Sequence, residues 1–319
     1  MARELLTAQK WIEAGHTVIL AIVARTWGSA PRRAGSLMVV RDDGTFEGSV
    51  SGGCVEGAVI SESTAILNRS LQIKSKKMVF SVTSEDAWDV GLACGGEIEV
   101  RLFPIASDSY SAIEAACTAV KRRNSGVLTF DVSVNSMVFK EMLHPPAKHT
   151  PHEEGDSFVT PVIPSLRLYI VGAVHIAQHL AVMAEECGFS VLIIDPRQAF
   201  TENRTFGTAK MINAWPDEFF ANNKPDVTTA VITLTHDPKL DDAALNTTLN
   251  SDAFYIGCLG SRKTHAKRIK RLSELGHTED ILKKINGPVG LNIGAATPAE
   301  IAVSVLAQLI ETARQTHEI

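Results

Sequence analysis

The sequence contains no apolar run as long as the roughly 18 residues that a membrane-spanning helix needs, so a transmembrane protein is not expected. Its first residues carry an early acid, Glu4, and no signal-peptide core, which favours a cytoplasmic protein. The net charge of −5 does not indicate a protein that binds nucleic acid or an anionic membrane. The motifs CxxC and HExxH are absent, which argues against a standard zinc site, and five widely spaced cysteines argue against a disulfide framework.

The composition of the 319 residues, with 45% hydrophobic and 21% charged, is typical of a soluble globular protein, and the length suits two domains. A proline-rich segment, residues 144–164, has few apolar residues before its end and predicts an interdomain linker. Its histidines could bind a metal, but a solvated linker is favoured; they are His144, His149 and His152. We therefore expect a first domain over residues 1–143, a linker over 144–165 and a second domain over 166–319.

The two predicted domains differ in the order of their elements. In the first, an α+β pattern predicts helices and strands in mixed order: helices over 3–14, 54–68 and 109–122, and strands over 17–25, 36–41, 78–82 and 98–103 with two more to follow. In the second, strands over 167–171, 190–195, 228–234 and 253–257 alternate with helices over 176–187, 241–249, 263–275 and 298–314. Because such alternation builds a parallel sheet covered on both faces, we expect an α/β protein with a Rossmann-like, doubly wound second domain.

A partial nucleotide-binding fingerprint opens the second domain. Gly172-Ala173-Val174-His175 lies between a predicted strand and a predicted helix, and Asp195 ends the next strand, where an acid can hold a ribose. Val174 replaces the glycine that lets the backbone approach a pyrophosphate, so we expect the Rossmann fold but favour a scaffold whose cleft serves another ligand. His175 is either catalytic or a residue of the helix start that caps the helix or contacts a ligand.

Three further segments are expected at the carboxyl ends of the strands, where ligands bind in such sheets. Thr235-His236-Asp237-Pro238 follows one strand, and Gly260-Ser261-Arg262-Lys263 follows the next and suits a phosphate at a helix N-terminus. Residues 290–298 precede the last helix, where Thr297, Pro298 and Glu300 predict a capped start. The remaining basic residues of the helix after Ser261 predict a solvated face: Lys267, Arg268, Lys270 and Arg271.

Two glycine-rich segments of the first domain each present a cysteine, Cys54 and Cys94. Since glycine lets a ligand approach the backbone closely, the pair suggests a site for a soft atom, sulfur or a transition metal, beside a polyanionic group. A helix start after Cys54 favours its thiolate, although burial as a small apolar residue is the alternative. A basic glycine-bearing loop with Arg32, together with Ser51, could cradle an anionic ligand. Glu56 is either a base or a first-turn acid that stabilises the helix; the other cysteines, Cys117, Cys187 and Cys258, are assigned to packing.

Together these segments resemble the xanthine dehydrogenase accessory (XdhC/CoxI) family over nearly the whole chain. The resemblance rests on residues 28–35, 48–56, 94–96, 235–237, 260–265 and 290–300. It implies a maturation factor that binds molybdenum cofactor, shelters it while a terminal sulfur is installed, and delivers it to a molybdenum hydroxylase such as xanthine dehydrogenase. It also implies three partners: the apo-enzyme, a cysteine desulfurase and a second copy of the chain. Similar proteins commonly have glycine at position 174, so Val174 is a departure.

The candidate site residues come from both domains. The residues expected to bind the cofactor are Arg32, Ser51, Cys54, Glu56, Cys94, His175, Asp195, His236, Asp237, Ser261 and Arg262, with Cys54 and Cys94 as contacts for the metal. A chaperone without turnover is favoured over an enzyme. The alternatives are an NAD(P)-dependent oxidoreductase, against which Val174 stands, and a sulfurtransferase that carries persulfide on Cys54 or Cys94.

Overall fold

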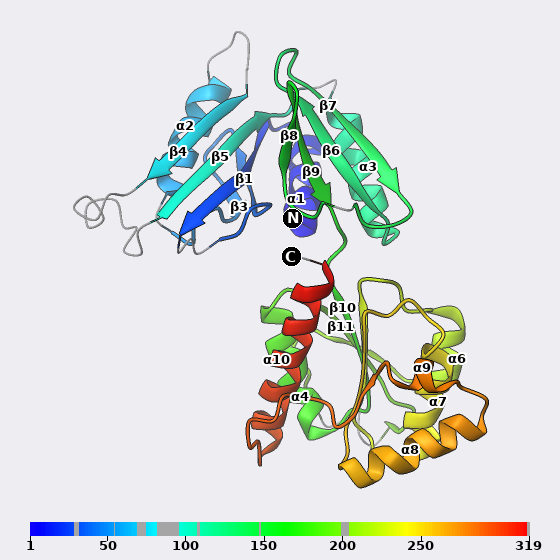
Figure 1. Ribbon diagram of the computed structural model, residues 1–319. Coiled ribbons are helices and arrows are strands. Elements are labelled where there is room, and N and C mark those ends of the chain that lie inside the picture. The colour runs from blue at the N-terminus through cyan, green and yellow to red at the C-terminus, as the bar shows by residue number, and fades with distance from the viewer. Residues whose placement is uncertain are drawn as a thin grey trace. The chain divides into compact units, whose positions relative to one another are not determined.

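The chain divides into two units, Met1–Pro164 and Ser165–Ile319, in a computed structural model (Figure 1). The structure describes residues 1–28, 32–53, 55–68, 75–81, 96–106, 109–146, 148–198 and 204–317. Within those ranges, no helix is both long and apolar enough to cross a membrane.

The first unit is built on two antiparallel sheets. Its helices are α1 (Ala2–Glu13), α2 (Glu56–Asn68) and α3 (Tyr110–Lys121). Its strands are β1 (Val18–Gly28), β2 (Leu37–Arg41), β3 (Phe46–Gly48), β4 (Lys76–Ser81), β5 (Gly96–Pro104), β6 (Ser125–Asp131), β7 (Ser136–Met142), β8 (His152–Glu154) and β9 (Ser157–Val162). One sheet has the order β3-β2-β1-β5-β4 and the other the order β7-β6-β9-β8, so the predicted α+β domain is confirmed.

Both faces of the five-stranded sheet are covered. The central strand β1 is buried and apolar at every position from Val18 to Ala24, and because side chains of a strand alternate between the faces, it presents apolar groups on both. One face shares a hydrophobic cluster with α1, α3 and the four-stranded sheet, in which Phe103 of β5 stacks on Phe130 of β6 at 4.0 Å between ring centroids. The other face packs against α2 through residues such as Val59. This second layer holds the start of α2, and with it the loop before α2, against the sheet.

The segment predicted as a linker is part of the first unit. Its residues 152–162 form β8 and β9, and β9 lies between β6 and β8 in the four-stranded sheet. Phe158 and Val162 enter the core, so this stretch is held by burial as well as by strand pairing. The prolines led to a wrong prediction because proline is normally excluded from the middle of a sheet. Here β8 pairs with β9 only as far as Val159, so Pro161 has no neighbouring strand on that side and is tolerated.

The second unit has a parallel sheet with the order β12-β11-β10-β13-β14-β15, in which the direction of winding reverses between β10 and β13. Its strands are β10 (Arg167–Val171), β11 (Ser190–Ile194), β12 (Lys210–Ile212), β13 (Thr229–Thr233), β14 (Tyr255–Cys258) and β15 (Ile285–Asn286). Its helices are α4 (His175–Glu186), α6 (Pro216–Asn222), α7 (Pro238–Thr248), α8 (Arg262–Glu274), α9 (Glu279–Leu282) and α10 (Pro298–His317). The Rossmann-like prediction is confirmed, whereas the short elements β12, β15, α6 and α9 were not predicted.

Helices cover the parallel sheet on both faces (Figure 1). Helices α4 and α10 pack on one face, and α6 and α7 pack on the other. The predicted cap of α10 is confirmed, because the Glu300 carboxylate accepts hydrogen bonds from Ala296 N at 2.7 Å and Thr297 N at 2.9 Å. Because β10, β13 and β14 are parallel neighbours, their carboxyl ends lie at one edge of the sheet, and the second-domain candidates lie at that edge.

The cysteines assigned to packing separate into two kinds. Cys117 and Cys258 are buried, as predicted, and burial raises the pKa of the Cys117 thiol to about 11. Cys187 is exposed, which corrects the prediction. It follows the last residue of α4, one position beyond the helix, and the buried stripe of that helix ends at Ala184.

Candidate functional site

Glu56 organises the glycine-rich loop that joins β3 to α2 in the first unit. Although it is the first residue of α2, its side chain turns back, and its carboxylate accepts six hydrogen bonds of 2.5–3.1 Å. The donors are the hydroxyls of Ser49 and Ser51 and the backbone N–H groups of Val50, Ser51, Gly52 and Gly53. The protein's own carboxylate therefore occupies the anion-binding concavity that the glycines create.

The same hydrogen bonds fix the charge of Glu56. Burial by itself would raise the pKa of the carboxyl group, but the bonds from Ser51 and Ser49 and from the backbone outweigh it and hold the pKa well below its ordinary value. A carboxylate this acidic and this fully bonded is a poor general base. Of the two interpretations of Glu56, the structure favours the acid that stabilises the loop and the helix start.

The predicted ligand contacts of the first unit are described only in part. Ser51 is buried, and its hydroxyl donates to Glu56 and accepts from Val55 N at 3.1 Å. Arg32 is exposed in a bend. Cys54 and Cys94 lie outside the described residues, so their roles stay predictions. The described neighbours of Cys54 are well held: Gly53 by Glu56, and Val55 by Ser51 and by burial.

At the switch point of the second unit, the turn after β10 packs directly on the end of β13. Gly172 has φ +114°, and a Cβ at this position would lie 2.7 Å from Thr235 Cγ2. The predicted helix start follows, with His175 exposed as the first residue of α4 and Val174 partly buried against the cluster beneath that helix. Only glycine satisfies both the backbone angle and the close approach at position 172.

Asp195, expected to be available to a ribose, is instead enclosed. Its side chain has 0% exposure and accepts from Ala173 N at 2.8 Å, from Arg197 N and Nε at 2.9 Å, and from Arg197 Nη2 at 2.7 Å. Burial opposes ionisation, but the bonds from Arg197 and Ala173 prevail and lower the pKa of Asp195. Asp195 therefore stabilises the turn after β10 and presents no exposed oxygen to a ligand.

After β13, a second buried carboxylate holds the backbone of the predicted Thr235–Asp237 segment. Asp241 accepts from Thr235 Oγ1 at 2.6 Å and from His236 N at 3.1 Å. This bracing holds His236 at φ +64°, a left-handed conformation, with its side chain exposed. Asp237 caps α7 by accepting from Lys239 N at 3.0 Å. Left-handed non-glycine residues often mark functional sites, so His236 gains support as a site residue.

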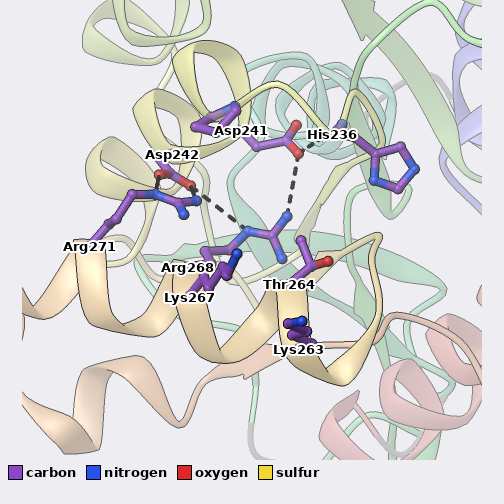
Figure 2. Close-up of a pocket in the computed structure, with 9 residues that line it drawn as sticks. His236, Asp241, Asp242, Lys263, Thr264, Lys267, Arg268 and Arg271 are labelled. Atoms are coloured by element: carbon purple, nitrogen blue, oxygen red, sulfur yellow. Dashed lines mark hydrogen bonds and ion pairs between the residues drawn. The ribbon is translucent and has the colours of Figure 1, made fainter.

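A pocket of about 230 Å³ opens between α7 and α8, and His236 lies at its edge (Figure 2). Arg268 is 2% exposed and pairs with Asp241 at 3.4 Å, while Arg271 makes a two-pronged contact with Asp242. Lys263 and Lys267 also line the pocket. The prediction of a solvated basic face is therefore wrong for Arg268, which is enclosed, and only partly right for Arg271.

Sequence reasoning missed this pocket, although one signal was present. Arg268 precedes the buried Leu272 by four residues, so the two share the inward face of α8. A cation on that face needs a buried acid as its partner, and Asp241, with Asp242 beside it, lies in the first turns of α7 after β13. The residue chosen instead, Ser261, caps α8 by accepting from Thr264 N at 3.2 Å, and Arg262 is exposed and does not line the pocket.

Metal ligands form no cluster of three or more His, Cys, Asp or Glu side chains in the part of the chain that the structure describes. The expected metal contacts Cys54 and Cys94 fall outside that part. The structure thus places His236 at a basic pocket, buries Asp195, and joins Ser51 and Glu56 by hydrogen bonds.

These features define a class, an α/β protein in which an antiparallel unit precedes a Rossmann-type unit. Family models agree with this division: the XdhC Rossmann domain matches residues 168–309, and the XdhC and CoxI family matches residues 11–73. A Bacillus subtilis protein named as a probable xanthine dehydrogenase subunit is 30% identical over 95% of this chain and 96% of its own length. The chain belongs to the XdhC and CoxI family.

Two further similarities extend over most of the chain. The "Molybdenum cofactor insertion chaperone PaoD" of Escherichia coli is 29% identical over 92% of this chain and 83% of its own length. A crystal structure described as a xanthine dehydrogenase from Bacillus halodurans matches with a TM-score of 0.76 and 25% identity, over 98% of this chain and 96% of that one.

Proposed function

We propose that this protein is a maturation chaperone that binds molybdenum cofactor, protects it, supports its sulfuration and delivers it to a xanthine dehydrogenase-type enzyme. The observation that carries the proposal is the similarity to PaoD, named as a molybdenum cofactor insertion chaperone, over 92% of this chain. The Bacillus subtilis relative, whose name refers to xanthine dehydrogenase, indicates the class of client enzyme. The cofactor is cargo for such a protein, so no turnover chemistry is required of the chain itself.

Within this proposal, Cys54 and Cys94 contact the molybdenum or its sulfur ligand. Support comes from the residues around Cys54, since Glu56 fixes Gly53 while Ser51 fixes Val55. A ligand contact works best when it is held in one geometry, and both described neighbours of Cys54 are held by hydrogen bonds. The proposal further includes a cysteine desulfurase as partner, a homodimer and a cytoplasmic location.

An NAD(P)-dependent oxidoreductase is the weaker alternative. A ribose would need a free carboxylate at the end of β11, and the Asp195 carboxylate already accepts four hydrogen bonds. Fluorescence titration with NADH and NADPH separates the two functions, because micromolar binding would favour the oxidoreductase.

The proposal is tested on the full-length protein purified from cells that synthesise the cofactor. We expect molybdenum, measured by mass spectrometry of the metal, and pterin, measured by fluorescence after oxidation, to co-purify in a constant ratio. The same preparation should activate an apo-form of a molybdenum hydroxylase. Protein that carries no pterin and gives no activation would contradict the proposal.

The thiol role is tested with Cys54→Ser and Cys94→Ser. The matched control is Cys187→Ser, which changes an exposed cysteine of the other unit. We expect both test variants to lose cofactor while the control retains it. A persulfide on wild-type Cys54 or Cys94 after incubation with a desulfurase and cysteine, detected by mass spectrometry, would instead support the sulfurtransferase alternative.

A further inference from the structure

The pocket between α7 and α8 carries more positive charge than its own carboxylates neutralise. Four cationic side chains line it, Lys263, Lys267, Arg268 and Arg271, against two carboxylates. Asp241 pairs with Arg268 and Asp242 pairs with Arg271. Within the described part of the chain, Lys263 and Lys267 form no ion pair, so the pocket presents two uncompensated ammonium groups.

The buried guanidinium supplies a second, independent observation. Arg268 is 2% exposed, yet its Nε and Nη1 have no hydrogen-bond partner among the described residues, and Nε lies 3.9 Å from Asp242 Oδ1. Its Nη2 donates to Leu259 O at 3.1 Å and to Asp241 at 3.4 Å, and its Nε faces Asp242 in a long ion pair, so Nη1 is the nitrogen without a hydrogen-bond or ion-pair partner in the described part of the chain (Figure 2). Since buried polar groups are nearly always paired, Nε and Nη1 lack the hydrogen-bond acceptors that their burial calls for.

The remaining wall of the pocket is preorganised. His236 is fixed in its left-handed conformation by the hydrogen bond from its N–H to Asp241, and its side chain also lines the pocket. Lys263 and Lys267 are four residues apart on α8 and so project from the same side of the helix. Cations from one element and a ring donor from another therefore converge on one small space.

From this geometry we propose that the pocket binds a phosphate group, held by Lys263, Lys267 and His236 above Arg268. Two free ammonium groups match a compact dianion better than a monoanion, because each oxygen can accept a charge-assisted bond. The volume of about 230 Å³ lies below the ~300 Å³ at which pockets begin to enclose whole drug-sized ligands, so the site suits the phosphate end of a ligand. The proposal concerns this chain's own residues and does not depend on the proposed chaperone function.

The test is isothermal titration calorimetry of the full-length protein with inorganic phosphate, acetate and a simple phosphate monoester such as AMP. We expect wild-type protein to bind phosphate more tightly than acetate, and the double variant Lys263→Gln/Lys267→Gln to bind phosphate roughly tenfold or more weakly. Tighter binding of inorganic phosphate would identify free phosphate as the occupant, and tighter binding of the ester would identify a phosphorylated ligand; both orders support the site.

The matched control is Lys270→Gln/Lys284→Gln, which removes the same charge from two exposed lysines of the same unit outside the pocket. An equal loss of affinity in both double variants would overturn the proposal, because it would indicate general attraction to a basic surface. Equal affinity for acetate and phosphate, or no phosphate binding at millimolar concentration, would overturn it as well. Loss of binding in Arg262→Gln alone would overturn it by placing the anion at the helix start instead. Circular dichroism of each variant verifies that the protein remains folded.

Discussion

At the scale of single residues, the Glu56 carboxylate occupies the place in the glycine-rich loop where an anionic ligand could otherwise bind. The glycine-rich loop before α2 directs four backbone N–H groups and two hydroxyls at one point, and the Glu56 carboxylate fills it. An exogenous anion in that position would have to displace a carboxylate that is bonded six times. We therefore assign Glu56 to holding the loop, with any ligand contact left to the residues that the loop presents.

The first prediction concerns Glu56→Gln, which exchanges a charged acceptor for a neutral amide whose NH₂ group faces donors. We expect the variant to lose about 2–4 kcal/mol of unfolding free energy at pH 7, measured by urea denaturation. The control is Glu62→Gln, on the same helix, where an ion pair with the exposed Lys76 is lost at a cost of ~1 kcal/mol or less. Equal losses in the two variants would mean that the six bonds contribute little.

The lowered pKa of Glu56 predicts how this difference depends on pH. A carboxyl group whose pKa is depressed in the folded protein stabilises the fold fully above its unfolded value, and the stabilisation disappears as the pH falls through the folded value. The difference in unfolding free energy between wild type and Glu56→Gln should therefore be constant above about pH 5. It should become smaller below the ordinary glutamate pKa of about 4.3. Denaturation curves at pH 7, 4 and 3 measure it, and a gap that widens in acid would contradict the assignment.

At the scale of elements, the turn from β10 to α4 depends on two contacts with neighbouring strands. Gly172 lies against Thr235 at the end of β13, and the Ala173 N–H donates to Asp195 at the end of β11. The turn is thus fastened to the strands on both sides of β10 at the point where the winding reverses. The Rossmann-type edge is held by the chain's own contacts.

Gly172→Ala tests this fastening. We expect a loss of about 1 kcal/mol or more from the left-handed backbone and a further ~1–3 kcal/mol from the clash with Thr235. Gly188→Ala provides the control, because Gly188 also has a positive φ of +87° but a Cβ there would meet nothing within 4 Å. Urea denaturation of the two variants isolates the contact, and indistinguishable midpoints would argue that the turn can move away from β13.

At the scale of the whole molecule, the boundary between the units follows Pro164 rather than residue 143. Strand β9 contributes Phe158, Val159 and Val162 to the first unit and pairs with β6 along its length. The second unit has hydrophobic clusters of its own, drawn from its strands and helices. Each unit therefore contains the layers that a domain needs.

We expect fragments 1–164 and 165–319 each to unfold cooperatively, whereas a fragment 1–143 should not fold, because it lacks β8 and β9. Thermal unfolding followed by circular dichroism compares the three. The shorter fragment serves as the test of the boundary, since it ends where the proline-rich segment begins. A cooperative transition in 1–143 would show that β9 is dispensable to the first core.

Most of the fold could be predicted because its signals are local. The apolar runs of β10 and β13, the proline at the start of α10 with Glu300 behind it, and the glycine turn before α4 each depend on residues close together in the chain. The proline-rich segment was misinterpreted because β9 is stabilised by β6, some 30 residues away, and its own composition resembles a linker.

The candidate site was harder to predict because burial and charge pairing join residues distant in sequence. The motifs that identify the family, and the positions of His236, Asp195 and Glu56 at the ends of elements, follow from the amino-acid order alone. The chain order cannot indicate that Asp195 is enclosed, that Glu56 fills its own loop, or that Arg268 is buried in the wall of a pocket that two lysines also line. Those outcomes depend on which side chains meet when helices pack on a sheet, and there desolvation and hydrogen bonding determine which charges are paired and which remain for a ligand.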